Sequence, residues 1–105
     1  MRTTAQILSE VSRFEPTDGM WLPLDQLLDE LWSAGLVTPE QLPVLLGVFE
    51  QFPTEDGAGV LWSIVHGIES LPFDYEPALR ESYRRVPSEM AEIMLVRLEN
   101  AGKPR

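Results

Sequence analysis

Residues 24–32 are Leu-Asp-Gln-Leu-Leu-Asp-Glu-Leu-Trp, and this stretch decides the fold class of the chain. Its apolar residues follow the i, i+3, i+4, i+7, i+8 spacing of one α-helical face without a miss. Pro23 suits the first turn of such a helix, and Gly35 suits the left-handed position that ends one. The stretch therefore predicts an amphipathic helix, which at this length needs other helices to bury its apolar side.

Five further segments carry the same helical spacing: residues 3–14, 38–52, 57–71, 74–86 and 87–102. The first begins with a capping-box pattern formed by Thr3 and Gln6. In the third helix of the chain, Pro43 lies past the first turn, so either residues 39–42 form a separate turn or the helix kinks there. Since no stretch alternates apolar and polar residues, we expect no sheet.

The chain of 105 residues has the length of one domain. Short links between the segments favour antiparallel neighbours, in effect three helical hairpins. We therefore expect a single all-α domain of about six short helices, packed either as a compact bundle or as a short solenoid-like array.

Composition excludes several classes of site. Without cysteine, the chain has no disulfide, thiolate metal site or cysteine nucleophile. No apolar run approaches the roughly 20 residues of a membrane span, and the first residues lack the apolar stretch of a secretory signal. We expect a cytoplasmic protein that uses no cofactor or metal and interacts with no membrane.

The distribution of charge is the most informative feature of the sequence. The net charge is −9, and residues 14–79 contain twelve carboxylates and neither lysine nor arginine, where about eight cations are expected from ordinary composition. Nucleic-acid binding needs cations for phosphate contacts, so we expect no nucleic-acid partner. The depletion is either a chance gap in an acidic protein or a surface kept free of cations for a cationic partner.

Two groups of acids are candidates for that surface. Asp25 and Asp29 lie four residues apart on the outward side of the second helix, a like-charge spacing that no nearby cation relieves. Glu55 and Asp56 lie in the glycine-rich link before the fourth helix. Each group is explained either by a solvated surface and a favourable helix start, or by contact with a partner.

Trp62, His66 and Glu69 form a stripe at i, i+4, i+7 on the fourth helix, away from its apolar face. Tryptophan is enriched at binding hot spots, so Trp62 is a candidate apolar anchor; the alternative is that it packs against a neighbouring helix. His66 and Glu69 are a weak candidate for acid–base or metal chemistry, because no second histidine, cysteine or nucleophile motif accompanies them.

Residues 61–71 are Leu-Trp-Ser-Ile-Val-His-Gly-Ile-Glu-Ser-Leu, and they are followed by Tyr-Glu-Pro at 75–77 and Val-Pro-Ser-Glu-Met at 86–90. Together these stretches resemble a group of small bacterial immunity proteins that accompany polymorphic or contact-dependent toxins, over about residues 20–102. The resemblance implies a small helical protein that binds a cognate toxin domain in the producing cell and blocks it. It supplies no established binding residues.

From the sequence we expect a non-catalytic inhibitor that covers a basic toxin surface with its acidic middle helices. The candidate contact residues are Asp25, Asp29, Glu55, Asp56, Trp62, His66 and Glu69. The alternative from another class is a helical adaptor or scaffold protein with an acidic protein-binding face. An enzyme is the least favoured alternative, because no catalytic motif is present.

Overall fold

The computed structural model describes residues 3–35 and 37–102, which form six α-helices. Their bounds are α1 Thr4–Ser12, α2 Leu22–Ala34, α3 Leu42–Gln51, α4 Val60–Glu69, α5 Glu76–Arg85 and α6 Glu89–Gly102. Helices make up well over half of the chain, and no β-strand occurs in the described ranges. The all-α prediction is confirmed.

Local sequence signals account for where the helices start. The Thr3 hydroxyl accepts a hydrogen bond from the Gln6 backbone N–H at 3.1 Å, and the Gln6 side chain accepts one from the Thr3 N–H at 2.8 Å, so the capping box is present. Before α3, the backbone N–H of Gln41 donates to the carbonyl of Thr38, which closes a separate turn. Helix α3 then begins at Leu42, so Pro43 lies in its first turn and removes no helical hydrogen bond.

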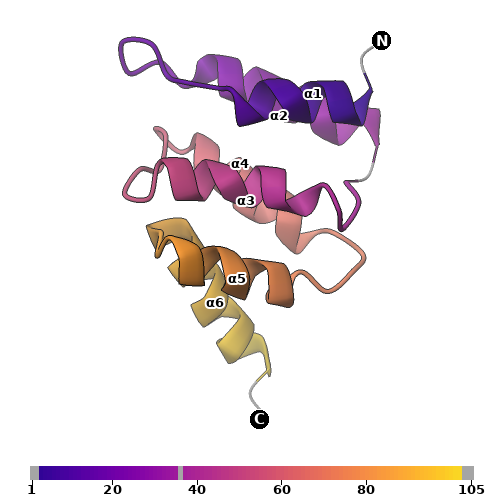
Figure 1. Ribbon diagram of the computed structural model, residues 1–105, viewed down its shortest axis with the longest axis vertical. Coiled ribbons are helices and arrows are strands. Elements are labelled where there is room, and N and C mark those ends of the chain that lie inside the picture. Colours follow the sequence, from indigo (N-terminus) through magenta and orange to yellow (C-terminus); the bar gives the residue numbers. More distant parts are fainter. Residues whose placement is uncertain (1–2, 36, 103–105) are drawn as a thin grey trace.

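The segments predicted at 3–14, 38–52, 57–71, 74–86 and 87–102 are all longer than the helices that form there. The fourth helix begins at Val60 rather than at residue 57, because Gly57, Ala58 and Gly59 have φ angles of 61°, 54° and 92°. Consecutive left-handed residues cannot belong to a right-handed helix. In the last helix, Ala101 continues the apolar spacing of Met90, Met94 and Leu98, which predicts an inward position, but it is exposed. Figure 1 shows the reason: the end of α6 projects beyond the neighbouring helices.

The six helices form three hairpins stacked along the longest axis of the molecule (Figure 1). Helix α3 contacts α1 on one side and α5 on the other, and α4 likewise lies between α2 and α6. No helix of the first hairpin contacts a helix of the last. The extents of 44 × 29 × 22 Å fit this arrangement, which is that of a short stacked array.

The apolar core runs through all three tiers. The apolar residues of α4 at helical spacing have no exposed surface; they are Leu61, Ile64, Val65 and Ile68. The middle tier is the most deeply buried because both of its helices have neighbours above and below. None of the described helices combines the length and the apolar character that crossing a lipid bilayer requires.

Candidate functional site

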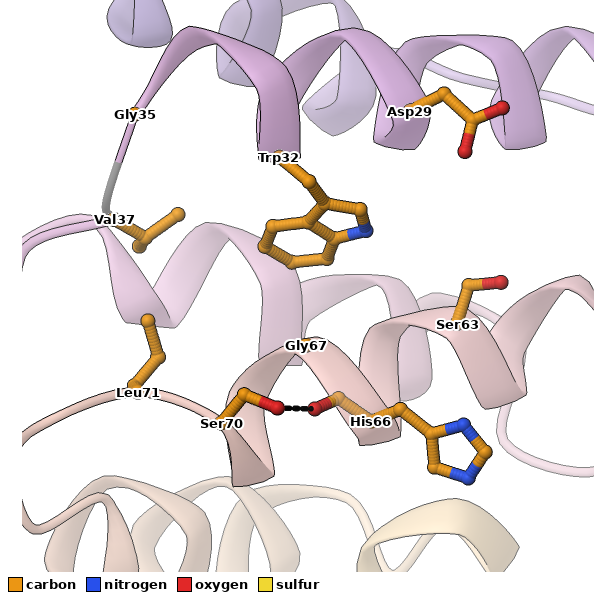
Figure 2. A pocket seen from close by; sticks show the side chains of 9 residues that line it. All are labelled: Asp29, Trp32, Gly35, Val37, Ser63, His66, Gly67, Ser70 and Leu71. Carbon is orange, nitrogen blue, oxygen red and sulfur yellow. Dashed lines mark hydrogen bonds between the residues drawn. The ribbon is translucent and has the colours of Figure 1, made fainter.

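A groove with a volume of about 470 Å³ lies between α2 and α4 (Figure 2). Its walls come from the C-terminal half of α2, the following link, and most of α4. Nine residues line it: Asp29, Trp32, Gly35, Val37, Ser63, His66, Gly67, Ser70 and Leu71. The volume falls within the range of about 300–1,000 Å³ that is usual for binding pockets.

Small residues on α4 create the space. Ser63 and Gly67 on α4, and Ser70 directly after its last residue, follow i, i+4, i+7 spacing and line one side of the groove. Gly67 lies directly beneath the indole ring of Trp32, and a Cβ atom at this position would overlap the ring. The glycine therefore allows the two helices to approach with the indole between them.

Trp32 and Asp29 project from α2 into the region above α4 (Figure 2). The indole nitrogen of Trp32 is turned toward the end of the groove where Asp29 and Ser63 lie. Within the described part of the chain, neither the indole N–H nor the Asp29 carboxylate has a hydrogen-bond partner or a counter-ion. Both groups are available to a ligand.

Two other polar side chains of the groove, those of Ser70 and His66, are less available to a ligand. The Ser70 hydroxyl donates to the backbone carbonyl of His66 at 2.9 Å, so it is satisfied within its own helix. The His66 imidazole is exposed and points away from Trp32 (Figure 2). The groove therefore presents one carboxylate, and no cationic side chain faces it among its lining residues.

The other predicted acids lie at the beginning of the same two helices. Asp25, Asp29 and Trp32 follow i, i+4, i+7 spacing, so Asp25 lies on the groove side of α2, one turn earlier than Asp29. Trp21, which precedes α2, packs against Gly57 in the link before α4, where a Cβ atom would lie 2.9 Å from the ring. The link carrying the exposed Glu55 and Asp56 is therefore next to the first turn of α2.

The stripe of Trp62, His66 and Glu69 lies next to the groove on the surface of α4, and Glu69 contacts α6. The rings of Trp62 and His66 are 6.1 Å apart. Trp62 is half-buried: part of its side chain packs against the core and part is exposed. His66 belongs to this stripe and also lines the groove.

Glu69 is engaged within the protein. Its carboxylate accepts hydrogen bonds from Arg97 of α6 at 2.7 and 2.9 Å, and only 19% of its side chain is exposed. The nearby Tyr75 hydroxyl is partly buried, and its pKa is raised by this burial and then by the negative charge of Glu69, although Arg97 opposes the effect. Glu69 thus links α4 to α6, and the exposed part of its side chain belongs to the surface of α4.

A second arginine links α5 to α3 in the same way. Arg85 of α5 donates to both oxygens of Glu50 on α3, at 3.1 and 3.0 Å, and the buried Ser82 hydroxyl donates to the same carboxylate at 2.9 Å. The pKa of Glu50 is lowered chiefly by the hydrogen bond from Arg85, with burial opposing and Ser82 assisting.

The absence of lysine and arginine from residues 14–79 predicts uncompensated carboxylates, and this prediction is wrong for Glu50, Glu69 and Glu76, which pair with arginines. The partners of Glu50 and Glu69 are more than 25 residues away in the sequence, so these two pairings depend on tertiary packing. Glu76 instead pairs locally with Arg80 at 2.7 Å, and Glu81 pairs locally with Arg85 at 3.6 Å.

The groove is not predicted by the sequence pattern. By its spacing Trp32 belongs to the apolar stripe of its helix, and no motif gives a role to Ser63, Gly67 or Ser70. The available signal was a glycine inside a strongly helical segment, which usually marks close packing. In the described ranges, no group of three or more histidine, cysteine, aspartate or glutamate residues has a geometry that would hold a metal ion.

Comparison of the chain with protein-family models, with curated proteins and with solved structures returned no match.

Proposed function

We propose that this protein is an immunity protein that binds a cognate bacterial toxin domain in the producing cell and occludes it. The observation that carries the proposal is the acidic side formed by α2, α4 and the link between α3 and α4. Asp25, Asp29, Glu55 and Asp56 lie there, and none of these four carboxylates has a cationic partner within the described part of the chain. An unneutralised surface of one sign accelerates association with a partner of the opposite sign.

The placement of the cations supports this assignment. Arg80, Arg84, Arg85 and Arg97 all lie in the last hairpin, and each forms an ion pair with a carboxylate of this protein. They therefore leave the α2–α4 side acidic. A basic toxin surface that normally contacts phosphate groups has the charge that would complement it.

Inhibition by occlusion requires no chemistry from the inhibitor. The exposed His66 would contribute contact area, and Trp62 would supply an apolar anchor beside the acidic side. A helical adaptor with an acidic face remains the competing function, because stacked helical hairpins are common binding scaffolds.

The test is co-expression with the C-terminal domain of a large toxin encoded directly upstream of this gene. The proposal expects a stoichiometric complex on co-purification and loss of toxin activity at one equivalent of this protein. His66→Ala should retain protection. If one equivalent or more leaves the toxin fully active and unbound, the adaptor function is favoured. Reversal of the toxin's effect by catalytic amounts would instead favour an enzyme.

A further inference from the structure

We propose that the groove between α2 and α4 receives an arginine side chain of the partner protein, with the guanidinium against Trp32 and Asp29. This inference rests on the proposed function, since it assigns the chemistry of the group that the acidic side recognises. It concerns a specific pocket, however, and can be tested without the partner.

The charge of the groove selects a cation. Asp29 is the only one of the nine lining residues with a carboxylate, and it has no counter-ion in the described ranges. Helices α2 and α4 contain no lysine or arginine, so no internal side chain competes for the site from either wall. Asp25, Glu55 and Asp56, at the beginning of the two helices, add to the same negative potential.

The shape of the groove selects guanidinium rather than ammonium. The indole of Trp32 forms one wall and is only half-buried, so part of its ring is accessible. A planar guanidinium can stack on an aromatic ring while its N–H groups donate to a carboxylate, and this combination distinguishes arginine from lysine. The partly exposed Leu71 adds apolar surface to the same groove, at the end away from Asp29.

The groove also has room for such a side chain. Its volume is about 470 Å³, and the two serines that line it, Ser63 on α4 and Ser70 directly after α4, present little bulk beside the indole. Ser63 adds a hydroxyl that has no hydrogen-bond partner among the described residues and lies on the same side as Asp29. The remaining guanidinium N–H groups thus have a second acceptor.

The experiment is an NMR titration of the ¹⁵N-labelled protein with N-acetyl-arginine methylamide. We expect saturable shifts at millimolar concentrations in the Trp32 indole N–H and in the backbone amides of Ser63 and Gly67. The corresponding citrulline derivative has nearly the same shape without the charge, and it should produce no such shifts. The lysine derivative should bind more weakly than the arginine derivative.

Asp29→Asn should weaken arginine binding by about threefold to tenfold. Glu99→Gln removes the same charge from an exposed position on α6 and is the matched control, which should leave binding unchanged. Asp29 is exposed, so both variants should keep the parent's melting temperature and spectral dispersion.

Three results would overturn the proposal: equal shifts from citrulline, equal binding of lysine, or no effect of Asp29→Asn. The proposed function fails by a different result. If the groove binds arginine as expected but the protein forms no complex with the toxin domain, the arginine pocket stands and the immunity function falls. The converse result is also distinguishable. If the protein binds the toxin domain, but Asp29→Asn does not change the affinity and the groove does not bind arginine, the proposed function stands and the arginine pocket is rejected.

Discussion

The hydrogen atom that serves as the side chain of Gly67 is all that the packing of α4 beneath Trp32 allows. Any larger side chain there meets the indole ring, whereas Gly47 in α3 has open space where a Cβ atom would be placed. The chain thus offers two glycines in helix interiors with opposite packing. Comparing them separates the steric role of Gly67 from the general effect of glycine on a helix.

Gly67→Ala should displace the Trp32 indole and reduce the free energy of unfolding by about 1–2 kcal/mol, because overpacking outweighs the gain in helix propensity. Gly47→Ala, the control, should be neutral or stabilising by up to about 1 kcal/mol. Chemical denaturation measures both, and the indole N–H resonance reports the displacement. Equal stability of the two variants would show that the indole moves aside without cost.

Trp62 packs against the core and is also a candidate contact residue for the toxin domain. It is half-buried against the core, with His66 beside it. Trp62→Ala should lower the free energy of unfolding by about 2 kcal/mol, less than the roughly 3–5 kcal/mol typical of a fully buried aromatic residue. In a complex with the toxin domain it should also speed dissociation by a factor that corresponds to about 2 kcal/mol or more.

Thermal melts of the Trp62→Ala variant must accompany the kinetics. Measurements at a temperature where this variant is fully folded isolate its effect on the complex. An unchanged dissociation rate under those conditions would assign Trp62 to the fold alone.

At the scale of the helices, two arginines link the last hairpin to the middle one. Arg85 bonds Glu50 between α5 and α3, and Arg97 bonds Glu69 between α6 and α4. The contact between α3 and α5 depends more strongly on its carboxylate than the contact between α4 and α6 does. The reason is that the fully buried Ser82 hydroxyl needs Glu50 for its hydrogen bond.

The lowered pKa of Glu50 makes this contact sensitive to acid. Since the folded-state pKa lies below the ordinary value of 4.5, its contribution to stability is present above that value and is lost as the pH falls through the lowered pKa. Glu50→Gln keeps an acceptor for Ser82 but removes the titration. The variant should be less stable than the parent at neutral pH and should lose less stability between about pH 5 and pH 3.

Chemical denaturation across this pH range provides the measurement. Glu55→Gln changes an exposed carboxylate outside the interface between α3 and α5, so it should follow the pH dependence of the parent. If Glu50→Gln and Glu55→Gln behave alike, the carboxylate of Glu50 does not carry the acid sensitivity.

For the whole molecule, the stacking of hairpins determines where the net charge of −9 is expressed. The arginines of α5 and α6 are used within the last hairpin and at its contact with the middle tier, whereas the α2–α4 side has no cation of its own. Under the proposed function the α2–α4 side attracts a cationic partner, although exposed acids such as Glu92 and Glu99 of α6 also contribute to the negative charge of the surface.

Replacing Asp25 and Asp29 together with lysine should slow association with the toxin domain and flatten its dependence on salt, because rim charges act mainly on the association rate. The control makes the same change in net charge at the exposed Glu92 and Glu99 of α6, and it should have the smaller effect. Stopped-flow association from low to high ionic strength distinguishes them. Equal effects of the two double variants would show that net charge, rather than the α2–α4 side, steers binding.

Much of the fold follows from local pattern. Apolar spacing of 3.6 residues, prolines in first turns and the capping box at Thr3 suffice to predict six helices, although most of their bounds differ from the predicted ones by a few residues. The errors have local causes as well. The start of α4 was missed because Ala58, which is not glycine, adopts a left-handed conformation between two glycines.

The candidate site was less accessible to prediction. The spacing of Trp62 and His66 correctly predicts that their rings are neighbours, because both lie on one helix. The groove could not be predicted in the same way. Its two walls come from helices whose relative rotation depends on how Trp32 fits over Gly67.

The amino-acid sequence by itself determined the helices, their apolar faces and the depletion of cations between residues 14 and 79, since each depends on neighbours within a few positions or on composition alone. Only the tertiary structure decided which carboxylates are neutralised and where an open groove remains. Glu50 and Glu69 meet arginines that are 35 and 28 residues away, while Asp29 meets none in the described ranges. The physical reason is that an ion pair or a pocket requires side chains on separate helices to approach within a few ångströms, and the stacking of the hairpins sets that distance.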